Sequence, residues 1–309
     1  MKEMVAEPSR KSATSFIRLA NLMRHWFRSL KLDPTLRFVI GFIVTVIYIM
    51  PLFWMVSTSL KQPAEILQTP PVLFPSQPQI ESYRSALGLA TNRPELYITG
   101  ALYFKNSFII AASTMLLTLI LAIPAAYSLS RFNFHGKLPF MLFLLVAQML
   151  PAVLLVIPLF VLFKMAGLYN TYFSVILADT ALALPFAIII LRTSYAQIPD
   201  ALEEAGLIDG ATRLQVLWYI ILPLIRASLV AVGVFSFLTA WGEFVFALSF
   251  LAKPELQPIS IGVFQFIGMY KTQWDTMMAF STLVAIPAVI ALLFLQRQFI
   301  SGMTSGSMK

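Results

Sequence analysis

Six apolar runs, each long enough to cross a lipid bilayer, limit the fold of this chain more than any other feature. An α-helix needs about 20 residues to span the hydrocarbon core, and these runs are about 19 to 26 residues long. A membrane β-barrel would instead show alternating segments of about ten residues. We therefore predict an all-α polytopic membrane protein with six transmembrane helices: Phe38–Val56, Phe108–Ser128, Leu138–Phe163, Phe173–Leu191, Ser228–Leu251 and Thr276–Leu295.

The residue composition supports this class and excludes several kinds of site. Of 309 residues, 59% are hydrophobic and only 12% are charged, too few to cover the surface of a soluble protein of this length. The chain has no cysteine, which excludes disulfides, thiol nucleophiles and cysteine metal sites. Because there are also only two histidines, we expect no metal site.

Prolines are frequent within and beside the apolar runs. Proline removes a helical hydrogen bond and clashes with the preceding turn, so it kinks a helix. Neighbouring helices must then satisfy the freed backbone groups. We therefore predict kinked helices packed in a bundle, with the bends near Pro51, Pro124, Pro151, Pro158, Pro185 and Pro287.

The distribution of lysine and arginine predicts the orientation in the membrane. Fifteen of the 22 basic residues lie before Phe38, in the connectors after the second and fourth runs, and in the tail. Because segments rich in these residues stay in the cytoplasm, both termini are predicted to be cytoplasmic. The net charge of +8 is then a topology signal, and we expect no nucleic-acid partner. The predicted parts are a basic N-terminal segment (1–37), a membrane domain (38–296) and a tail (297–309).

The cytoplasmic connector after the fourth run, at about residues 195–223, carries a helical pattern. Pro199 suits the first turn of a helix, and Glu203 and Glu204 follow early in it, where carboxylates favour the positive end of the helix dipole. An apolar stripe recurs at helical spacing at Ile198, Leu202, Ala205 and Ile208. Asp209 and Gly210 form a turn signal, and Asp209 is predicted to cap the helix that follows.

A second apolar stripe, at Leu214, Leu217 and Ile221, continues the pattern after this turn. We therefore predict two short helices, bent at Gly210, that project into the cytoplasm. An ordinary amphipathic loop on the membrane surface is the alternative interpretation. The two glutamates of the first helix argue against it, because the cytoplasmic leaflet is anionic and attracts basic residues.

The connector resembles the Glu-Ala-Ala signature of inner-membrane permeases of ATP-binding-cassette (ABC) importers. In that pattern the triplet is followed by three residues, a glycine, nine residues and then Ile-x-Leu-Pro. Glu204-Ala205-Gly206, Gly210 and Ile220-Ile221-Leu222-Pro223 stand at those spacings. Gly206 replaces the second alanine of the triplet, which lowers the helix propensity by about 1 kcal/mol.

Further motifs resemble the carbohydrate importers of the maltose-transporter type. Residues 131–137, RFNFHGK, are similar to the Arg-x-x-Phe-x-Gly-Lys connector after the second helix of those permeases. Residues 202–211, LEEAGLIDGA, are similar to their form of the coupling loop. Residues 241–244, WGEF, resemble their Trp-Asn-Glu-Phe motif, with Gly242 in place of asparagine. The tail FISGMTSGSMK, residues 299–309, is similar to their glycine-rich C-terminus, so the resemblance covers about residues 35 to 309.

This resemblance implies a specific set of partners in a bacterial or archaeal cytoplasmic membrane. A second, related permease would pair with this chain, two ATPase subunits would bind below, and an extracytoplasmic solute-binding protein would deliver a sugar, either a di- or oligosaccharide or a polyol. The connector would dock on an ATPase and move as a lever. The resemblance assigns this coupling role to Glu203, Glu204, Ala205, Gly206, Asp209, Gly210 and Ala211.

The chain itself has no nucleotide-binding loop. No G-x-x-x-x-G-K-[ST] stretch is present to hold phosphates. ATP and Mg²⁺ are therefore expected at the partner ATPase subunits and no cofactor on this chain. No nucleophile–base set stands out either, so we expect no catalytic residue and do not classify this polypeptide as an enzyme.

Four residues in the apolar runs are candidates for the substrate pathway. An ionisable group within a membrane is costly and usually faces a cavity or a polar partner, which applies to Asp179 and Glu243. Gln148 and Trp241 offer the polar and aromatic surface that sugars prefer. Bonding to a neighbouring helix is the alternative for both acids. In the maltose-type relatives most substrate contacts come from the partner permease.

Two other functions remain open at this point. A six-span bundle with proline-broken helices is also consistent with half of a proton- or sodium-coupled carrier. Such a carrier tends to have inverted repeats and several buried acids, whereas here only Asp179 and Glu243 are found and no repeat is clear. The same ABC machinery for another solute, such as an amino acid or a phosphorylated polyol, is the second alternative.

Overall fold

The computed structural model describes residues 34–89, 99–268 and 272–306. Most of the predicted N-terminal segment and the last three residues lie outside the described residues. The chain divides into two units, residues 1–54 and 55–309, and the boundary falls within helix α2 (Pro34–Ser59). The described elements are helices, with one isolated β-bridge between Ile267 and Thr272, which confirms the predicted all-α class.

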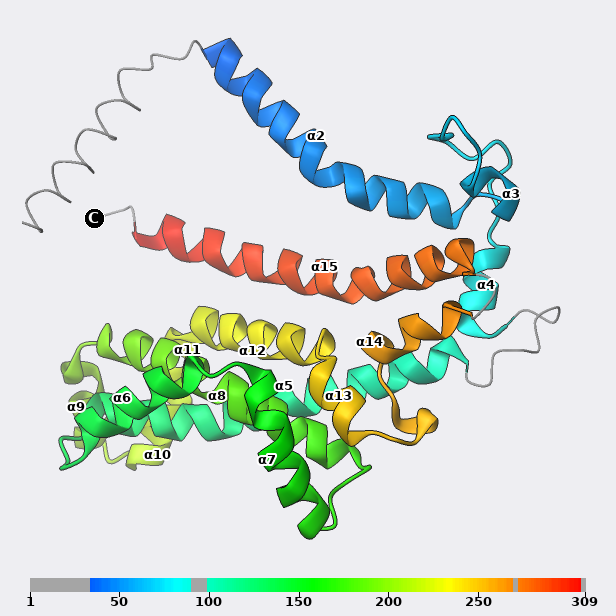
Figure 1. Ribbon diagram of the computed structural model, residues 1–309. Helices are drawn as coiled ribbons and strands as arrows, with labels where there is room; N and C mark the ends of the chain where they lie inside the picture. Colours follow the sequence, from blue (N-terminus) through cyan, green and yellow to red (C-terminus); the bar gives the residue numbers. More distant parts are fainter. Residues whose placement is uncertain (1–33, 90–98, 269–271, 307–309) are drawn as a thin grey trace, which may run out of the picture. The chain divides into compact units, whose positions relative to one another are not determined.

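Three helices of the second unit pack against one another: α5 (Gly100–Arg131), α8 (Tyr172–Ala196) and α12 (Arg226–Trp241) (Figure 1). Helices α5 and α8 run in the same direction. The Tyr172 hydroxyl donates to Asn106 Oδ1 at one end (2.7 Å), and the rings of Tyr127 and Tyr195 meet edge to face at the other end. Small residues fill the contact and let the helix backbones approach closely, among them Ala122, Ala126, Ala183 and Ala187.

Four of the six predicted spans are single helices, found within α2, α5, α8 and α15 (Trp274–Gly306). The third predicted span, Leu138–Phe163, is not one continuous helix. This run forms α6 (Lys137–Gln148) and α7 (Ala152–Met165), which are bent by 103°. The bend follows from Pro151, which has no amide hydrogen to donate and disfavours helical backbone at the residue before it.

The fifth predicted span, Ser228–Leu251, is also broken. Its chain forms α12 and the short helix α13 (Val245–Phe250), with Gly242–Phe244 between them. The Glu243 carboxylate accepts hydrogen bonds from the amides of Phe246 and Ala247, at 2.7 and 2.9 Å. Glu243 therefore caps the start of a new helix, and this capping ends the continuous span.

Short helices lie at the end of the bundle opposite the connector at residues 195–223 (Figure 1). They are α3 (Pro63–Ile66), α4 (Glu81–Leu87), η2 (Pro254–Leu256), α14 (Ile259–Gly262) and η3 (Val263–Phe266). Gly100 allows α4 and α5 to meet, because a Cβ atom there would lie 1.9 Å from the Ala86 carbonyl oxygen. The side chain of Ser82 on α4 donates to Asp275 at the start of α15 (3.2 Å).

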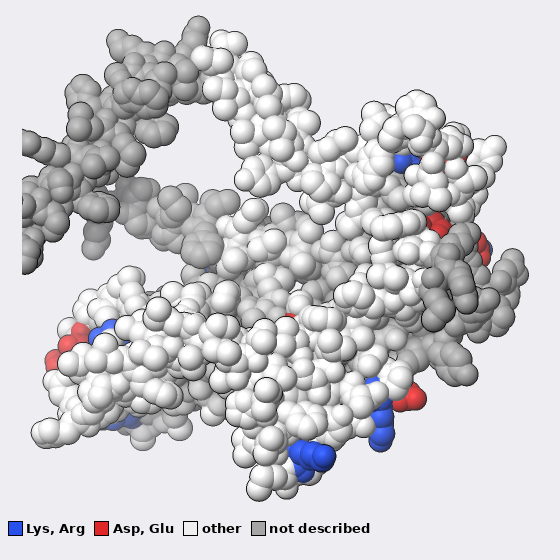
Figure 2. Space-filling model, in the orientation of Figure 1, with Lys and Arg blue, Asp and Glu red and all other residues white. Residues whose placement is uncertain are grey.

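The last helix, α15, extends beyond the predicted span. Its backbone stays helical through Gly306, so residues 297–306 of the predicted tail continue the helix. On the face shown in Figure 2, the charged side chains lie at the two ends of the second unit and along its lower edge, and most of the remaining surface is uncharged. This distribution suits a chain whose middle lies in hydrocarbon.

Candidate functional site

The connector after α8, which was predicted to be cytoplasmic, begins with helix α9 (Asp200–Ile208) after a short turn. Pro199 is the residue at the helix start, and Asp200 and Glu203 lie in the first turn, where they favour the positive end of the dipole. The helix ends at Ile208 with Asp209 as its C-cap, and Gly210 follows with a φ of +87°, in the left-handed region that favours glycine. The predicted bend at Gly210 is confirmed.

The prediction that Asp209 caps the next helix is wrong. Thr212 is the N-cap of α10 (Arg213–Gln215), and it exchanges hydrogen bonds with Gln215 in a capping box. Asp209 instead closes the C-terminal end of α9. The spacing of a threonine and a glutamine three residues apart is the known capping-box pattern, so the sequence did contain the signal.

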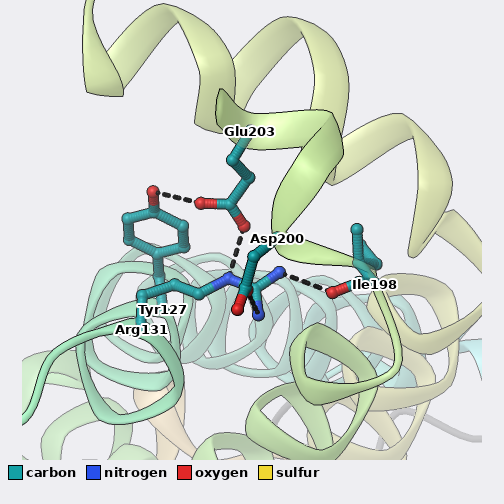
Figure 3. A network of polar contacts seen from close by, with 5 residues as sticks. All are labelled: Tyr127, Arg131, Ile198, Asp200 and Glu203. Atoms are coloured by element: carbon teal, nitrogen blue, oxygen red, sulfur yellow. Dashed lines mark hydrogen bonds and ion pairs between the residues drawn. The ribbon is translucent and has the colours of Figure 1, made fainter. Parts of the chain in front are cut away.

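A buried polar network fastens α9 to the end of α5 (Figure 3). Arg131, the last residue of α5, forms an ion pair through Nε with Glu203, and its other nitrogens contact Asp200 Oδ1 (2.8 Å) and the Ile198 carbonyl (2.9 Å). The Tyr127 hydroxyl donates to the second oxygen of Glu203 at 3.0 Å. The side chains of Arg131 and Glu203 are 11% and 9% exposed. Sequence reasoning did not find this network, although Arg131 was noted within a motif.

The inward face of α9 is formed by Glu203 and Gly206. A Cβ atom at Gly206 would lie 2.7 Å from Ile220 Cδ1 and 3.1 Å from Val216 Cγ2. The alanine that the signature carries at this position would therefore displace the Ile220 side chain. Gly206 thus has a packing role at the contact between α9 and the segment that follows α10.

The apolar stripe predicted for α9 faces outward. Ile198, which precedes the helix, is buried, but Leu202 is 45% and Ile208 is 85% exposed, and Ala205 is exposed between them. Glu204 and Asp209 are exposed as well. The helix therefore presents an apolar strip flanked by carboxylates, while its inward face carries the buried Glu203 and Gly206, with Leu207 packed partly against the core. This is the reverse of a helix that packs its apolar stripe into its own core.

The chain after α10 turns back into the bundle. The π-helix η1 (Val216–Ile221) and α11 (Leu222–Leu224) follow, and then the chain bends by 82° into α12. Of the second predicted stripe, Leu217 and Ile221 are buried, but Leu214 is 64% exposed. Pro223 has no amide hydrogen, which suits a change in the helical hydrogen-bond pattern at this point.

No hydrogen bond joins any two of the four candidate pathway residues in the described part of the chain, although Asp179 and Glu243 lie within electrostatic range of each other. Asp179 is 1% exposed, and neither of its carboxylate oxygens has a hydrogen-bond partner in the part of the chain that the structure describes. Trp241 is buried in an apolar cluster with Ala240 and Phe280, where its ring stacks on Phe237 and its indole nitrogen donates to the Val284 carbonyl. Gln148 is exposed at the end of α6, and Glu243 caps α13. Their role in the pathway stays a prediction.

Comparison with known proteins identifies relatives over nearly the whole chain. Residues 116–305 match the family described as the inner membrane component of binding-protein-dependent transport systems. The chain is 34% identical to a trehalose/maltose transport system permease of Thermococcus litoralis, covering 88% of this chain and 95% of that protein. It is 31% identical to a sulfoquinovosyl glycerol transport system permease of Agrobacterium fabrum (89% and 93%) and 31% identical to a diacetylchitobiose uptake system permease of Streptomyces coelicolor (84% and 92%).

A solved structure shares the fold. It is a bacterial ABC transporter involved in the import of the acidic polysaccharide alginate, matched with a TM-score of 0.73 at 20% identity. The match covers 87% of this chain and 97% of the other chain.

Proposed function

The chain belongs to the family of inner-membrane components of binding-protein-dependent transport systems, and we propose that it forms, with a second related permease, the pathway by which a sugar crosses the cytoplasmic membrane. Three relatives at 31 to 34% identity are named for glycosides or oligosaccharides, which supports a sugar as the substrate class. In this proposal an extracytoplasmic protein delivers the sugar. Two separate ATPase subunits bind ATP and Mg²⁺, and this chain catalyses no reaction.

The observation that carries the coupling part of this proposal is the orientation of α9. Its inward face is fastened to α5 by the Arg131 network, and its apolar strip of Leu202, Ala205 and Ile208 is left exposed. An exposed apolar strip on a short, firmly held helix suits helix-in-groove recognition by a partner. A partner that moves this helix would also move α5, because the ion pair joins them.

This geometry divides the predicted coupling residues into two groups. The exposed residues Glu204, Ala205 and Asp209 are proposed to contact the ATPase subunit, together with Leu202 and Ile208. The inward residues Glu203 and Gly206 are proposed to hold the helix in place. Gly210 and Ala211 form the turn after the helix. The side that carries α9 is proposed to be cytoplasmic, as are both termini, because most basic residues lie on that side.

Site-specific crosslinking tests the docking surface. Because the natural chain has no cysteine, single variants Leu202→Cys and Ile208→Cys can each carry a photo-crosslinker. We expect both to crosslink to a co-purified ATPase subunit. The control is Leu67→Cys, which is 77% exposed at the opposite end of the bundle and is expected to give no ATPase adduct. Equal crosslinking from all three positions, or none from α9, would contradict the proposed docking surface.

A reconstituted system tests the substrate and the energy source. The purified complex in vesicles is given ATP and a panel of binding proteins loaded with sugars, amino acids or phosphorylated polyols. We expect a sugar-loaded binding protein to stimulate ATP hydrolysis and uptake. Full uptake driven by a sodium or proton gradient without ATP would refute the proposal in favour of an ion-coupled carrier.

A further inference from the structure

A basic pocket of about 450 Å³ lies beside the start of α6, on the same side of the bundle as α9. Its lining contains two cations, Lys137 and Arg192, and no acidic residue. The remaining lining residues are apolar or glycine: Phe134, Gly136, Leu138, Pro139 and Met141. The volume is within the range of small-molecule pockets, which is about 300–1,000 Å³.

The cations of this pocket are not neutralised within the described chain. Arg192 Nε is buried without a hydrogen-bond partner, and Arg192 forms no ion pair with another described residue. Lys137 Nζ donates only to the Phe132 carbonyl, at 3.2 Å. A buried guanidinium nitrogen without a partner is costly, so this arrangement indicates an acceptor that the chain itself does not supply.

The pocket also lies at the positive end of a helix. Gly136 is the N-cap of α6, with a φ of +99°, and the first turn of this 12-residue helix contains no acidic side chain. The Lys137 amide donates to the Phe134 carbonyl (3.4 Å) and Pro139 has no amide hydrogen, so the helix contributes mainly its dipole, whose positive end favours an anion. The helix charge and the two side chains therefore act on the same volume.

The surroundings of the pocket indicate a lipid as the source of the anion. Helix α6 continues from the pocket with exposed apolar side chains, Leu138, Leu142 and Phe143, which suit contact with acyl chains. The cytoplasmic leaflet carries anionic headgroups, and basic pockets between helices on that side are a known form of lipid recognition. An acyl chain along α6 would leave a phosphate at the level of Lys137 and Arg192.

We propose that the pocket formed by Lys137, Arg192 and the start of α6 binds the phosphate headgroup of an anionic phospholipid of the cytoplasmic leaflet. The lipid would bridge α6 and α8, which pack against each other and carry the two cations. This proposal uses the membrane orientation given above, but it does not depend on the sugar or on the ATPase. Its test therefore measures lipid binding and not transport.

Native mass spectrometry of the purified full-length chain in detergent tests this site. The chain is titrated with phosphatidylglycerol, with phosphatidylcholine and with soluble glycerol phosphate. We expect phosphatidylglycerol to bind more tightly than the other two. Each cation near an anionic lipid is worth about fivefold in affinity, so Lys137→Gln/Arg192→Gln should weaken phosphatidylglycerol binding roughly 25-fold.

The matched control is Arg213→Gln/Arg226→Gln, which removes the same charge from the same end of the bundle at two exposed residues outside the pocket. We expect this variant to keep the preference for phosphatidylglycerol. An equal loss in both double variants would overturn the proposal, because the attraction would then come from general surface charge. Equal binding of phosphatidylcholine, or of soluble glycerol phosphate, would overturn the assignment to an anionic lipid.

Discussion

Replacing Arg131 by alanine should release α9 from the bundle. The substitution removes three contacts at once and leaves the nearly buried Glu203 with only the Tyr127 hydroxyl as a partner. Removing one member of a buried ion pair costs about 3–5 kcal/mol, because the other charge stays buried. The contact with Asp200 contributes little, since the Asp200 side chain is 76% exposed.

Hydrogen exchange of the α9 amides measures this release. At the lower end of that range, about 3 kcal/mol, the opening of α9 should become easier on the order of 150-fold, and exchange should accelerate by the same factor. ATP-driven transport by the Arg131→Ala variant should decrease, because a loosened α9 cannot transmit motion to α5. Membrane insertion should be unchanged, since the six apolar runs remain intact.

Two further variants determine whether the ion pair is the cause. The double variant Arg131→Ala/Glu203→Gln removes the unpaired carboxylate charge and should recover most of the stability of α9 that Arg131→Ala loses. Arg213→Ala removes a cation 5.5 Å from the centre of the Phe132 ring, and should change exchange less than tenfold. The reasoning is refuted if Arg131→Ala accelerates exchange no more than Arg213→Ala, or if the double variant is as loose as the single one.

Three other substitutions probe the turn at Gly210, the contact at Gly100 and the cap at Glu243. A Cβ atom at Gly210 would meet open space, but Gly210→Ala forces alanine to a φ of +87°. This substitution should therefore lower the free energy of unfolding by about 1–2 kcal/mol and reduce uptake. An unchanged denaturant midpoint and unchanged uptake would argue against backbone strain at this residue. Gly100→Ala places a Cβ atom against the backbone of Ala86 and should destabilise the chain by about 1–3 kcal/mol in thermal unfolding. The control is Gly233→Ala, which should be tolerated because the nearest atom to its Cβ would be 3.5 Å away. Glu243→Ala leaves two amides of α13 without their cap and should cost about 1–2 kcal/mol, with Glu243→Gln costing less. If Glu243→Gln keeps stability but abolishes sugar uptake, the carboxylate acts in the pathway and not only as a cap.

The sequence determined the fold class and the family, because both depend on information that is local along the chain. Apolar runs of bilayer length require helices wherever they occur, since no water is present to satisfy the backbone. The turn at Gly210 was equally local, because a left-handed backbone favours glycine. The spacing from Glu204 to Pro223 needed no three-dimensional information either.

Sequence patterns were less reliable where helices end inside the membrane. The runs over Leu138–Phe163 and Ser228–Leu251 are continuously apolar, yet both are broken in the structure. Pro151 was noted as a source of a kink, but the size of the bend depends on what packs against α7. The break before α13 depends on a hydrogen bond from backbone amides to Glu243, and a hydropathy pattern carries no information about that bond.

Only the tertiary structure decided which face of α9 is buried. Leu202, Ala205 and Ile208 have the spacing of a stripe that faces the core. The same spacing is found in a stripe that binds a partner, so the sequence pattern does not distinguish the two. The choice was made by Arg131, which is 72 residues from Glu203 along the chain and draws the carboxylate inward. Burying an unpaired charge costs much more free energy than leaving a short apolar strip exposed. The ion pair between Arg131 and Glu203 therefore sets the orientation of the helix.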